Sequence, residues 1–186
     1  MAQDTQTRLN SAWQRVRMDI PNMMQIFNKS KATNEKQLWQ DIQEATDVNA
    51  IIDAVEDLAE VDTPTAKQWV YDRICADTWH GAMMQEYAKK IITEAGYQAA
   101  TATEQQDREG IDLIATDGNR RYNIQIKPLS FFKSSDKICR YKRSVLRDRC
   151  RRNNIYIMVY DYGHFLKWDG KKYLHKIDDI LTLWQK

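Results

Sequence analysis

The stretch "GIDLIATDGNRRYNIQIKP", from Gly110 to Pro128, decides the fold because two apolar runs flank a turn. "IDLIAT" and "RYNIQIK" have the alternation of β-strands, and "DGNR" between them has the residues of a hairpin turn. In the second strand, Ile124 and Ile126 point to one face of the sheet. Gln125 and Lys127 point to the other face. The apolar pair is expected to enter the core, which leaves an amide and an ammonium on the opposite face.

The sequence around this hairpin predicts an α/β domain over residues 79–186. Before the hairpin, "WHGAMMQEYAKKIITEA" has a helical pattern that ends at a C-cap glycine, and "YQAATATE" is a strand candidate. After it, "DKICRYKRSVLRDRCRR" has a helical period, and "IYIMVY" is typical of a strand covered on both faces. "HFLKW" and "KKYLHKI" are expected to form a closing hairpin before a terminal helix. The predicted core is a mixed central sheet flanked by helices.

Residues 1–78 predict a separate, all-helical region. Residue types that favour helix starts precede several periodic segments, and Thr63 before Pro64 is expected to be an N-cap. The expected helices are Thr5–Met18, Asn22–Asn28, Asn34–Ala45, Val48–Glu60 and Pro64–Asp77.

Composition excludes several classes of protein. The chain has 186 residues and a formal net charge of +2, which suits one domain with a small helical appendage. Its three cysteines share no CxxC spacing, so neither a disulfide framework nor a structural zinc site is indicated. No apolar run approaches the ~18 residues of a membrane span, and no signal pattern begins the sequence. We therefore expect a cytoplasmic protein without a membrane partner.

Charge is divided unevenly along the chain. Nine acidic residues and one lysine lie between Thr33 and Ala66, whereas nine basic residues and two aspartates lie between Lys133 and Arg152. In the basic segment, arginines recur at helical spacing opposite the apolar half, and the row consists of Arg140, Arg143, Arg147 and Arg151. With Lys133, this row predicts a surface for the phosphates of double-stranded DNA. The alternative is that the arginines face solvent or pair with the acidic segment of the same or a second subunit.

The hairpin also brings together groups that bind metal ions. Asp112 begins the first strand, and pairing across the turn places it close to Gln125 and Lys127. The carboxylate, the amide oxygen and the backbone carbonyl of Ile126 suit the preference of Mg²⁺ for oxygen, and Mn²⁺ is expected to substitute. Lys127 is expected to orient the attacking water or to stabilise charge on a phosphate.

An Asp in "GID" followed by "QIK" at the end of the next strand resembles the PD-(D/E)XK nuclease superfamily, whose fold is called restriction-endonuclease-like. Gln125 stands where the commonest motif has Asp or Glu, so the chain is similar to the QxK variant of the Mrr-like branch. The resemblance covers about residues 79–162. It implies a metal-dependent DNA endonuclease with Asp112 as the central metal ligand, Gln125 as the second ligand and Lys127 as the catalytic lysine.

The resemblance also implies a catalytic acid from the preceding helix, which would be Glu86. Glu109 competes with it for this role. A surface ion pair with Lys89 or Lys90 is the simpler interpretation of Glu86.

The other site residues have simpler interpretations too. Asp112 would suit a turn in which it bonds the backbone after Gly110. Gln125 and Lys127 would suit the solvated face of an edge hairpin. The three residues together are less easily explained without chemistry.

A small chain with its own helical region most resembles a type II restriction endonuclease, in which two copies face a duplex and each cuts one strand. A homodimer is therefore expected, with the helical region supplying dimer contacts or DNA recognition. One alternative is a structure-specific nuclease, such as a junction resolvase, a repair enzyme or a phage enzyme. Another is a catalytically silent DNA-binding or scaffolding module.

Overall fold

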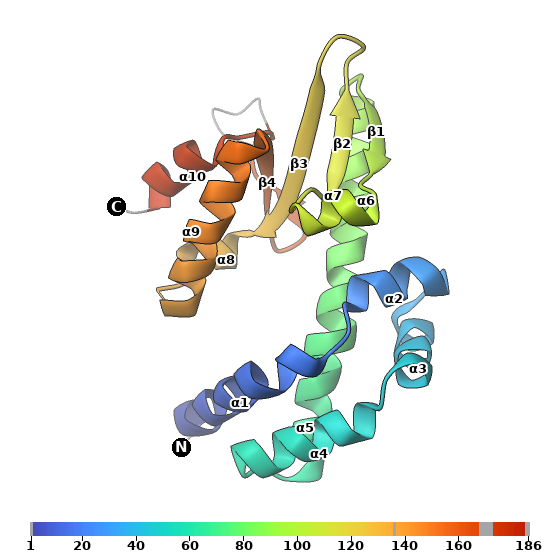
Figure 1. The fold of residues 1–186 in the computed structure, drawn as a ribbon, viewed down its shortest axis with the longest axis vertical. Helices are drawn as coiled ribbons and strands as arrows, with labels where there is room; N and C mark the ends of the chain where they lie inside the picture. Colours follow the sequence, from blue (N-terminus) through green and yellow to red (C-terminus); the bar gives the residue numbers. More distant parts are fainter. Residues whose placement is uncertain (1, 136, 168–172, 185–186) are drawn as a thin grey trace. The chain divides into compact units, whose positions relative to one another are not determined.

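The computed structural model describes residues 2–135, 137–167 and 173–184 of the chain (Figure 1). The backbone divides into two compact units, which we call the helical unit (Met1–Met83) and the sheet unit (Met84–Lys186). Helix α6 (Asp77–Glu94) contributes its first turns to the helical unit and the rest to the sheet unit. Among the helices that the structure describes, none combines the length and the apolarity that a bilayer crossing needs.

The helical unit confirms the predicted all-helical region. Its other helices are α1 (Ala2–Val16), α2 (Met23–Ser30), α3 (Glu35–Ala45), α4 (Val48–Ala59) and α5 (Thr63–Tyr71). A short 3₁₀ turn, Arg17–Asp19, follows α1. Four helices start at a side chain that accepts a hydrogen bond from a main-chain N–H two or three residues ahead, and these N-caps are Asn22, Asn34, Asp47 and Asp62.

Two details of this region were predicted wrongly. The N-cap of α5 is Asp62, whose carboxylate accepts from the N–H of Thr65 at 2.8 Å, so Thr63 is already helical. A π-helical turn over Asp72–Ala76 joins α5 directly to α6, where we expected a break after Asp77. Such a turn continues the backbone hydrogen bonding of the helix and needs neither Gly nor Pro. The sequence therefore contains no residue that would reveal that α5 and α6 are continuous.

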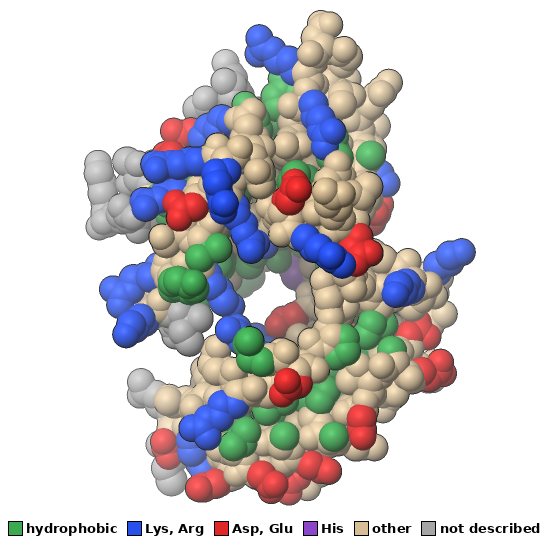
Figure 2. All heavy atoms as spheres, in the orientation of Figure 1, with side chains coloured by type: hydrophobic (Ala, Val, Ile, Leu, Met, Phe, Trp, Pro, Cys, Tyr) green, Lys and Arg blue, Asp and Glu red, His purple; other side chains and the backbone are tan. Residues whose placement is uncertain are grey.

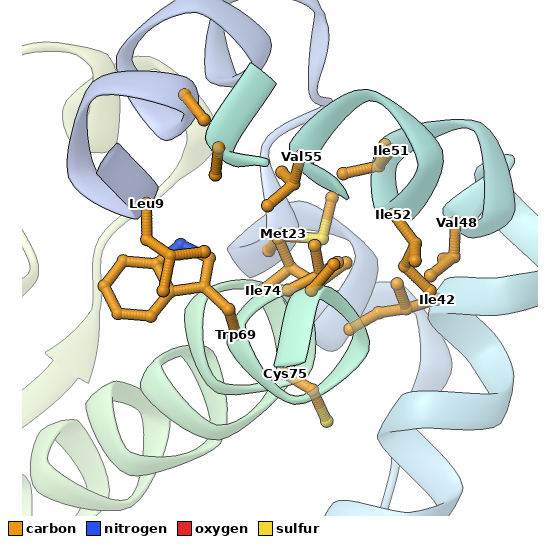
Figure 3. Close-up of a cluster of buried hydrophobic side chains, with 14 of the residues drawn as sticks. Leu9, Met23, Ile42, Val48, Ile51, Ile52, Val55, Trp69, Ile74 and Cys75 are labelled. Carbon is orange, nitrogen blue, oxygen red and sulfur yellow. The ribbon is translucent and has the colours of Figure 1, made fainter. Parts of the chain in front are cut away.

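Apolar side chains from successive helices fill the core of the helical unit (Figure 3). Leu38 and Ile42 of α3, Val55 of α4 and Val70 of α5 are completely buried there, and Ile74 in the π turn is 1% exposed. These positions recur at helical spacing, and their burial gives the unit an apolar interior of its own.

The sheet unit confirms the predicted α/β class. Its strands are β1 (Gln98–Thr101), β2 (Leu113–Thr116), β3 (Arg121–Pro128), β4 (Ile155–Asp161) and β5 (His164–Phe165). They form one sheet in the order β1-β2-β3-β4-β5. Only the β3–β4 pair is parallel among these described strands, so the sheet is mixed. The remaining helices are α7 (Glu104–Arg108), α8 (Leu129–Lys133), α9 (Lys137–Arg152) and α10 (Ile177–Trp184).

Helices cover both faces of this sheet. Met84, Ala88 and Ile92 of α6 pack on one face. The other face contacts α8, α9 and α10, with Leu146 and Cys150 among the buried side chains of α9. Strand β4 supplies buried residues to both clusters, as its continuous apolar run predicts.

The hairpin that decides the fold forms as expected. The carboxylate of Asp117 accepts from the N–H groups of Asn119 (3.0 Å) and Arg120 (2.8 Å), which closes the turn between β2 and β3. Ile124 and Ile126 enter the cluster on the α6 face. Their neighbours Gln125 and Lys127 therefore belong to the face that α9 covers.

Three features of the sheet unit differ from the prediction or were missed by it. The closing hairpin is wrong for the residues that the structure describes, because β5 pairs with β4 and His175 also bridges to Ile157 of β4. The "DG" of that predicted turn lies in residues 168–172, outside the described residues. Helices α7 and α8 were not predicted, although Thr103 and Gln106 form a capping box at the start of α7.

We expect Ile157→Ala to lower the free energy of unfolding of the sheet unit by about 2–5 kcal/mol. Ile157 is completely buried in the central strand β4, so the truncated side chain leaves a cavity under α9 and α10. Ile157→Val, which removes one methylene, is the matched control and should cost only about 0.5–1.5 kcal/mol. Urea unfolding followed by circular dichroism measures both, and equal losses for the two variants would contradict this packing.

Candidate active site

Asp112 stands where the pairing of β2 with β3 ends. The last paired residues of that ladder are Leu113 and Ile124. Beyond them, the N–H of Asp112 donates to the carbonyl of Ile124 at 2.8 Å, and the N–H of Ile126 donates to Asp112 Oδ2 at 2.6 Å. The carboxylate thus takes the place of a strand neighbour and is fixed on the edge of β3. The N–H that binds the Asp112 carboxylate belongs to β3, so Asp112 does not bond the backbone of the turn after Gly110.

Gln125 is buried, with an exposed fraction of 8%. Strand β3 lies between β2 and β4, and Gln125 is in register with Ile157 of β4. Gln125 therefore does not lie on the solvated face of an edge hairpin. Its Oε1 atom is buried and has no hydrogen-bond partner within the described part of the chain. A buried acceptor without a donor costs about 1–3 kcal/mol. An oxygen without a donor among the described residues is therefore buried on β3, one residue before the N–H that holds the carboxylate of Asp112.

The main chain at Gly110 forms one wall of this site. Its φ is +87°, a left-handed conformation that an L side chain rarely adopts. A Cβ at this position would stand 3.6 Å from both the Nε2 and Oε1 atoms of Gln125 and 3.8 Å from the Cδ atom of Arg149. Glycine is therefore favoured by the backbone conformation, since a Cβ would meet Gln125 and Arg149 only at ordinary contact distance.

Electrostatics at Asp112 are dominated by burial. Burial raises the pKa of this carboxyl above its ordinary value, while the charge of Lys127 and the hydrogen bond from Ile126 lower it, and the charge of Asp107 raises it. Lys127 therefore acts on Asp112 as the hairpin geometry predicts. Asp107 lies on α7, so it was missed with that helix, whose capping box is the signal that would have revealed it.

A cavity of about 470 Å³ opens between β3 and α9 on this face of the sheet. Its lining consists of Gln125, Lys127, Phe131, Tyr141, Lys142, Val145, Leu146 and Arg149. Within the described part of the chain, all charged members of this lining are basic. Cys150 lies in the apolar cluster on the same face, and burial raises the pKa of its thiol to about 12, which keeps it protonated and unsuited to nucleophilic attack.

The structure does not bring the candidate acids to this cavity. Glu86 is exposed on α6, the helix that covers the opposite face of the sheet, and its carboxylate lies 4.0 Å from Lys89 Nζ. Glu109 is also exposed, and its backbone carbonyl accepts from the Asn153 side chain at 3.5 Å. A catalytic role for Glu86 or Glu109 stays a prediction.

The arginines of the predicted DNA-binding row differ in what they contact. Arg143 donates to the carbonyl of Phe131 in α8 at 2.8 Å. Arg151 binds both carboxylate oxygens of Asp178 in α10, at 2.8 and 3.1 Å. Both side chains therefore bind partners within the sheet unit, and Arg151 is also exposed to solvent. Arg140 is exposed.

The surface over α9 is rich in basic side chains (Figure 2). Lys133, also predicted to contact DNA, is the last residue of α8 and is exposed. DNA contact by the whole row stays a prediction.

Comparison with known proteins decides the family. The sequence model of the MjaI restriction endonuclease family matches residues 10–162. The chain belongs to this family. Its members are type II restriction endonucleases, which cut DNA, and the match runs from α1 to the turn after β4, so it includes the helical unit as well as the candidate site. A comparison with curated proteins finds no match.

The burial of Asp112 predicts that ionisation of its carboxyl lowers the free energy of unfolding of the metal-free protein. Because the folded state raises its pKa, stability falls as pH rises from the ordinary value of 3.8 through the raised value. Asp112→Asn keeps an oxygen for the N–H of Ile126 but carries no charge. We expect this variant to melt at a higher temperature than the wild type at pH 8 in EDTA, and the difference to shrink toward pH 4.

Added Mg²⁺ provides the control for this prediction. It should raise the melting temperature of the wild type and leave Asp112→Asn unchanged, because only the carboxylate gains from a nearby cation. A wild type that is more stable than the variant at pH 8 without metal would show that Lys127 and the Ile126 N–H outweigh burial.

A second prediction separates the structural arginines from the exposed one. Arg143→Ala should lower the free energy of unfolding by about 1 kcal/mol, because the Phe131 carbonyl loses its donor. Arg140→Ala should leave melting unchanged and reduce the salt slope of DNA binding by about 0.9 if its charge contacts a phosphate. Thermal melting and DNA affinity measured between low and moderate salt test both. Equal melting temperatures for the two variants would contradict a stabilising role of the hydrogen bond from Arg143 to Phe131.

Proposed function

We propose that the chain is a Mg²⁺-dependent type II restriction endonuclease that hydrolyses duplex DNA at a specific sequence, with its site at the end of β3. The cutting of DNA follows from family membership. Metal dependence, the site residues, the dimer and membership of the PD-(D/E)XK superfamily in its QxK form belong to the proposal. The observation that carries the site is the buried oxygen of Gln125, which has no partner among the described residues and belongs to the residue just before the one whose N–H holds the carboxylate of Asp112.

The oxygens at this point suit a hard divalent cation. Asp112 uses Oδ2 for the N–H of Ile126, and the hydrogen bonds of the described residues leave its Oδ1 available. Gln125 offers Oε1, and the carbonyl of Ile126 points to the same edge of β3 as its N–H. One carboxylate, one amide oxygen and one main-chain oxygen, completed by waters, is a donor set that Mg²⁺ accepts, and Mn²⁺ takes the same ligands.

The bound cation would supply a Lewis acid that polarises the phosphate and activates the attacking water. The protein's own contribution is to hold the donors rigidly. Main-chain hydrogen bonding orients Asp112, and close packing against Gly110 limits the movement of Gln125. Positions fixed before the substrate arrives lower the free energy of reorganisation during the reaction.

Lys127 supplies positive charge from the same face of the sheet. It is two residues after Gln125, lines the cavity, and its charge acts on Asp112. An ammonium at this point would stabilise the negative charge that grows on the phosphate, or hold the attacking water. We retain Glu86 and Glu109 as proposed additional acids, although neither lines the cavity.

We further propose that the basic row on α9 and Lys133 contact the DNA backbone, with the chain acting as a homodimer that cuts one strand per copy. Guanidinium groups already bonded within the sheet unit keep further N–H donors for phosphate. The helical unit is proposed to supply dimer contacts or DNA recognition. Its acidic Thr33–Ala66 segment disfavours phosphate contact along that stretch.

Incubation of the purified protein with a long duplex tests this function first. With Mg²⁺ we expect discrete fragments, and in excess EDTA no cleavage. A random smear would indicate a nuclease without sequence specificity, and an intact duplex at all metal concentrations would indicate a silent DNA-binding module. Cleavage that persists in EDTA would contradict the metal mechanism.

Substitutions then test the residues. Asp112→Ala and Lys127→Ala should each reduce the cleavage rate by at least about 100-fold, because each removes charge stabilisation in the transition state. DNA affinity should stay within about tenfold, since many phosphate contacts share the binding free energy. Gln125→Glu restores the commoner acidic ligand and should stay active or change the preferred metal. Full cleavage by either alanine variant would overturn the assignment of the site.

A further inference from the structure

We propose that Arg149 binds the phosphodiester that is cut, by directing its guanidinium into the cavity above Gln125 and Lys127. This inference rests on the proposed function and extends it to a residue outside the motif. Arg149 is in the last turn of α9, on the wall of the cavity that faces the end of β3. The proposal is argued from packing, from charge and from the way α9 uses its other arginines.

The stem of Arg149 is placed beside the candidate metal ligands. Its Cδ atom lies 3.8 Å from the point where a Cβ of residue 110 would stand, and the amide of Gln125 lies 3.6 Å from the same point. Both side chains thus meet the same bare stretch of main chain at Gly110. The aliphatic part of a long cationic side chain commonly packs in this way while the charged head stays available.

The head of Arg149 has no partner of its own in the part of the chain that the structure describes. None of the hydrogen bonds and ion pairs there involves its guanidinium, and the residue is exposed. Arg143 and Arg151 on the same helix are each bonded to a neighbouring element. Helix α9 therefore uses Arg143 and Arg151 to hold the sheet unit together, while Arg149, which lines the cavity, keeps its donors for a ligand.

The position of Arg149 is unusual for a surface arginine. It falls on the half of α9 that carries the buried Leu146 and Cys150, where the helical pattern calls for an apolar residue. Lys142 falls on the same half and also lines the cavity. Two cations on the side of a helix that faces a sheet are explained if the space between helix and sheet receives an anion.

The cavity has the charge of an anion site. Its charged lining residues are Lys127, Lys142 and Arg149, and no Asp or Glu among the residues that the structure describes belongs to the lining. A volume of about 470 Å³ accommodates a phosphodiester with part of its sugar. A guanidinium can donate two parallel hydrogen bonds to the non-bridging oxygens of a phosphate, which an ammonium cannot do.

A donor at this place would act mainly on the rate. Negative charge on the phosphate oxygens increases as the attacking water approaches, so a fixed guanidinium binds the transition state more strongly than the ground state. Binding of the whole duplex, in contrast, is shared among many phosphate contacts. The effect of Arg149 should therefore appear in the cleavage rate at saturating enzyme.

Arg149→Ala, Arg149→Lys and the control Arg152→Ala test this inference. Arg152 is an exposed arginine three residues further along α9 that does not line the cavity. The substrate is a short duplex that carries the site mapped by cleavage of long DNA. Single-turnover cleavage is measured in Mg²⁺, DNA affinity is measured in EDTA, and melting temperature is recorded for each protein.

We expect Arg149→Ala to cleave about 100-fold more slowly than the wild type, with affinity within about fivefold and unchanged melting. Arg149→Lys should recover part of the rate, because charge returns without the paired donors. Arg152→Ala should cleave at a rate within about threefold of the wild type, since it can lose only a general phosphate contact.

A wild-type rate for Arg149→Ala would overturn the inference, and so would a loss that Arg152→Ala reproduces or that lower affinity fully accounts for. The outcome is separable from failure of the proposed function. If the wild type does not cut, the function fails. If the wild type cuts, Asp112→Ala does not, and Arg149→Ala cuts normally, only the role of Arg149 fails.

Discussion

The site depends on one hydrogen bond, from the N–H of Ile126 to the carboxylate of Asp112. It forms where β2 stops pairing with β3, so a side chain replaces the missing strand and the main chain of β3 keeps its partner. A buried N–H without an acceptor would be costly, and a carboxylate supplies a strong one. The same bond fixes the acid on the residue that follows Gln125 in β3. The end of a strand pair and the centre of the proposed chemistry are therefore one structural feature.

This arrangement is unfavourable for stability on its own. Burial raises the pKa of Asp112, and Gln125 buries an oxygen without a donor within the described residues. The hydrogen bond to the N–H of Ile126 offsets part of the cost at Asp112, whereas the buried oxygen of Gln125 has no structural partner among the described residues. Costs of this kind are expected where a site waits for a ligand, and the proposed cation would relieve both.

Much of this arrangement could be predicted from the sequence. Alternation in β3 assigned Ile124 and Ile126 to the core face, and turn chemistry at Asp117 fixed the hairpin that brings Asp112 to Gln125. Local pattern was enough there because adjacent strands of a hairpin pair by the shortest route. The π turn between α5 and α6 and the pairing of β5 with β4 were not predictable in this way. Each depends on packing between residues that no local pattern relates.

Helix α9 shows what a local sequence pattern cannot predict, which is the contact that each arginine makes. Its arginines recur at one helical spacing, and period alone treats them as one surface with one partner. In the structure Arg143 is bonded to α8 and Arg151 to α10, while Arg149, which interrupts the apolar half, is the one that lines the cavity. An interruption of the apolar half lowers the hydrophobic stabilisation of the helix, so it is informative when a cavity lies opposite. In α9, the proposed ligand of the cut phosphate is therefore the arginine on the apolar half and not a member of the regular row.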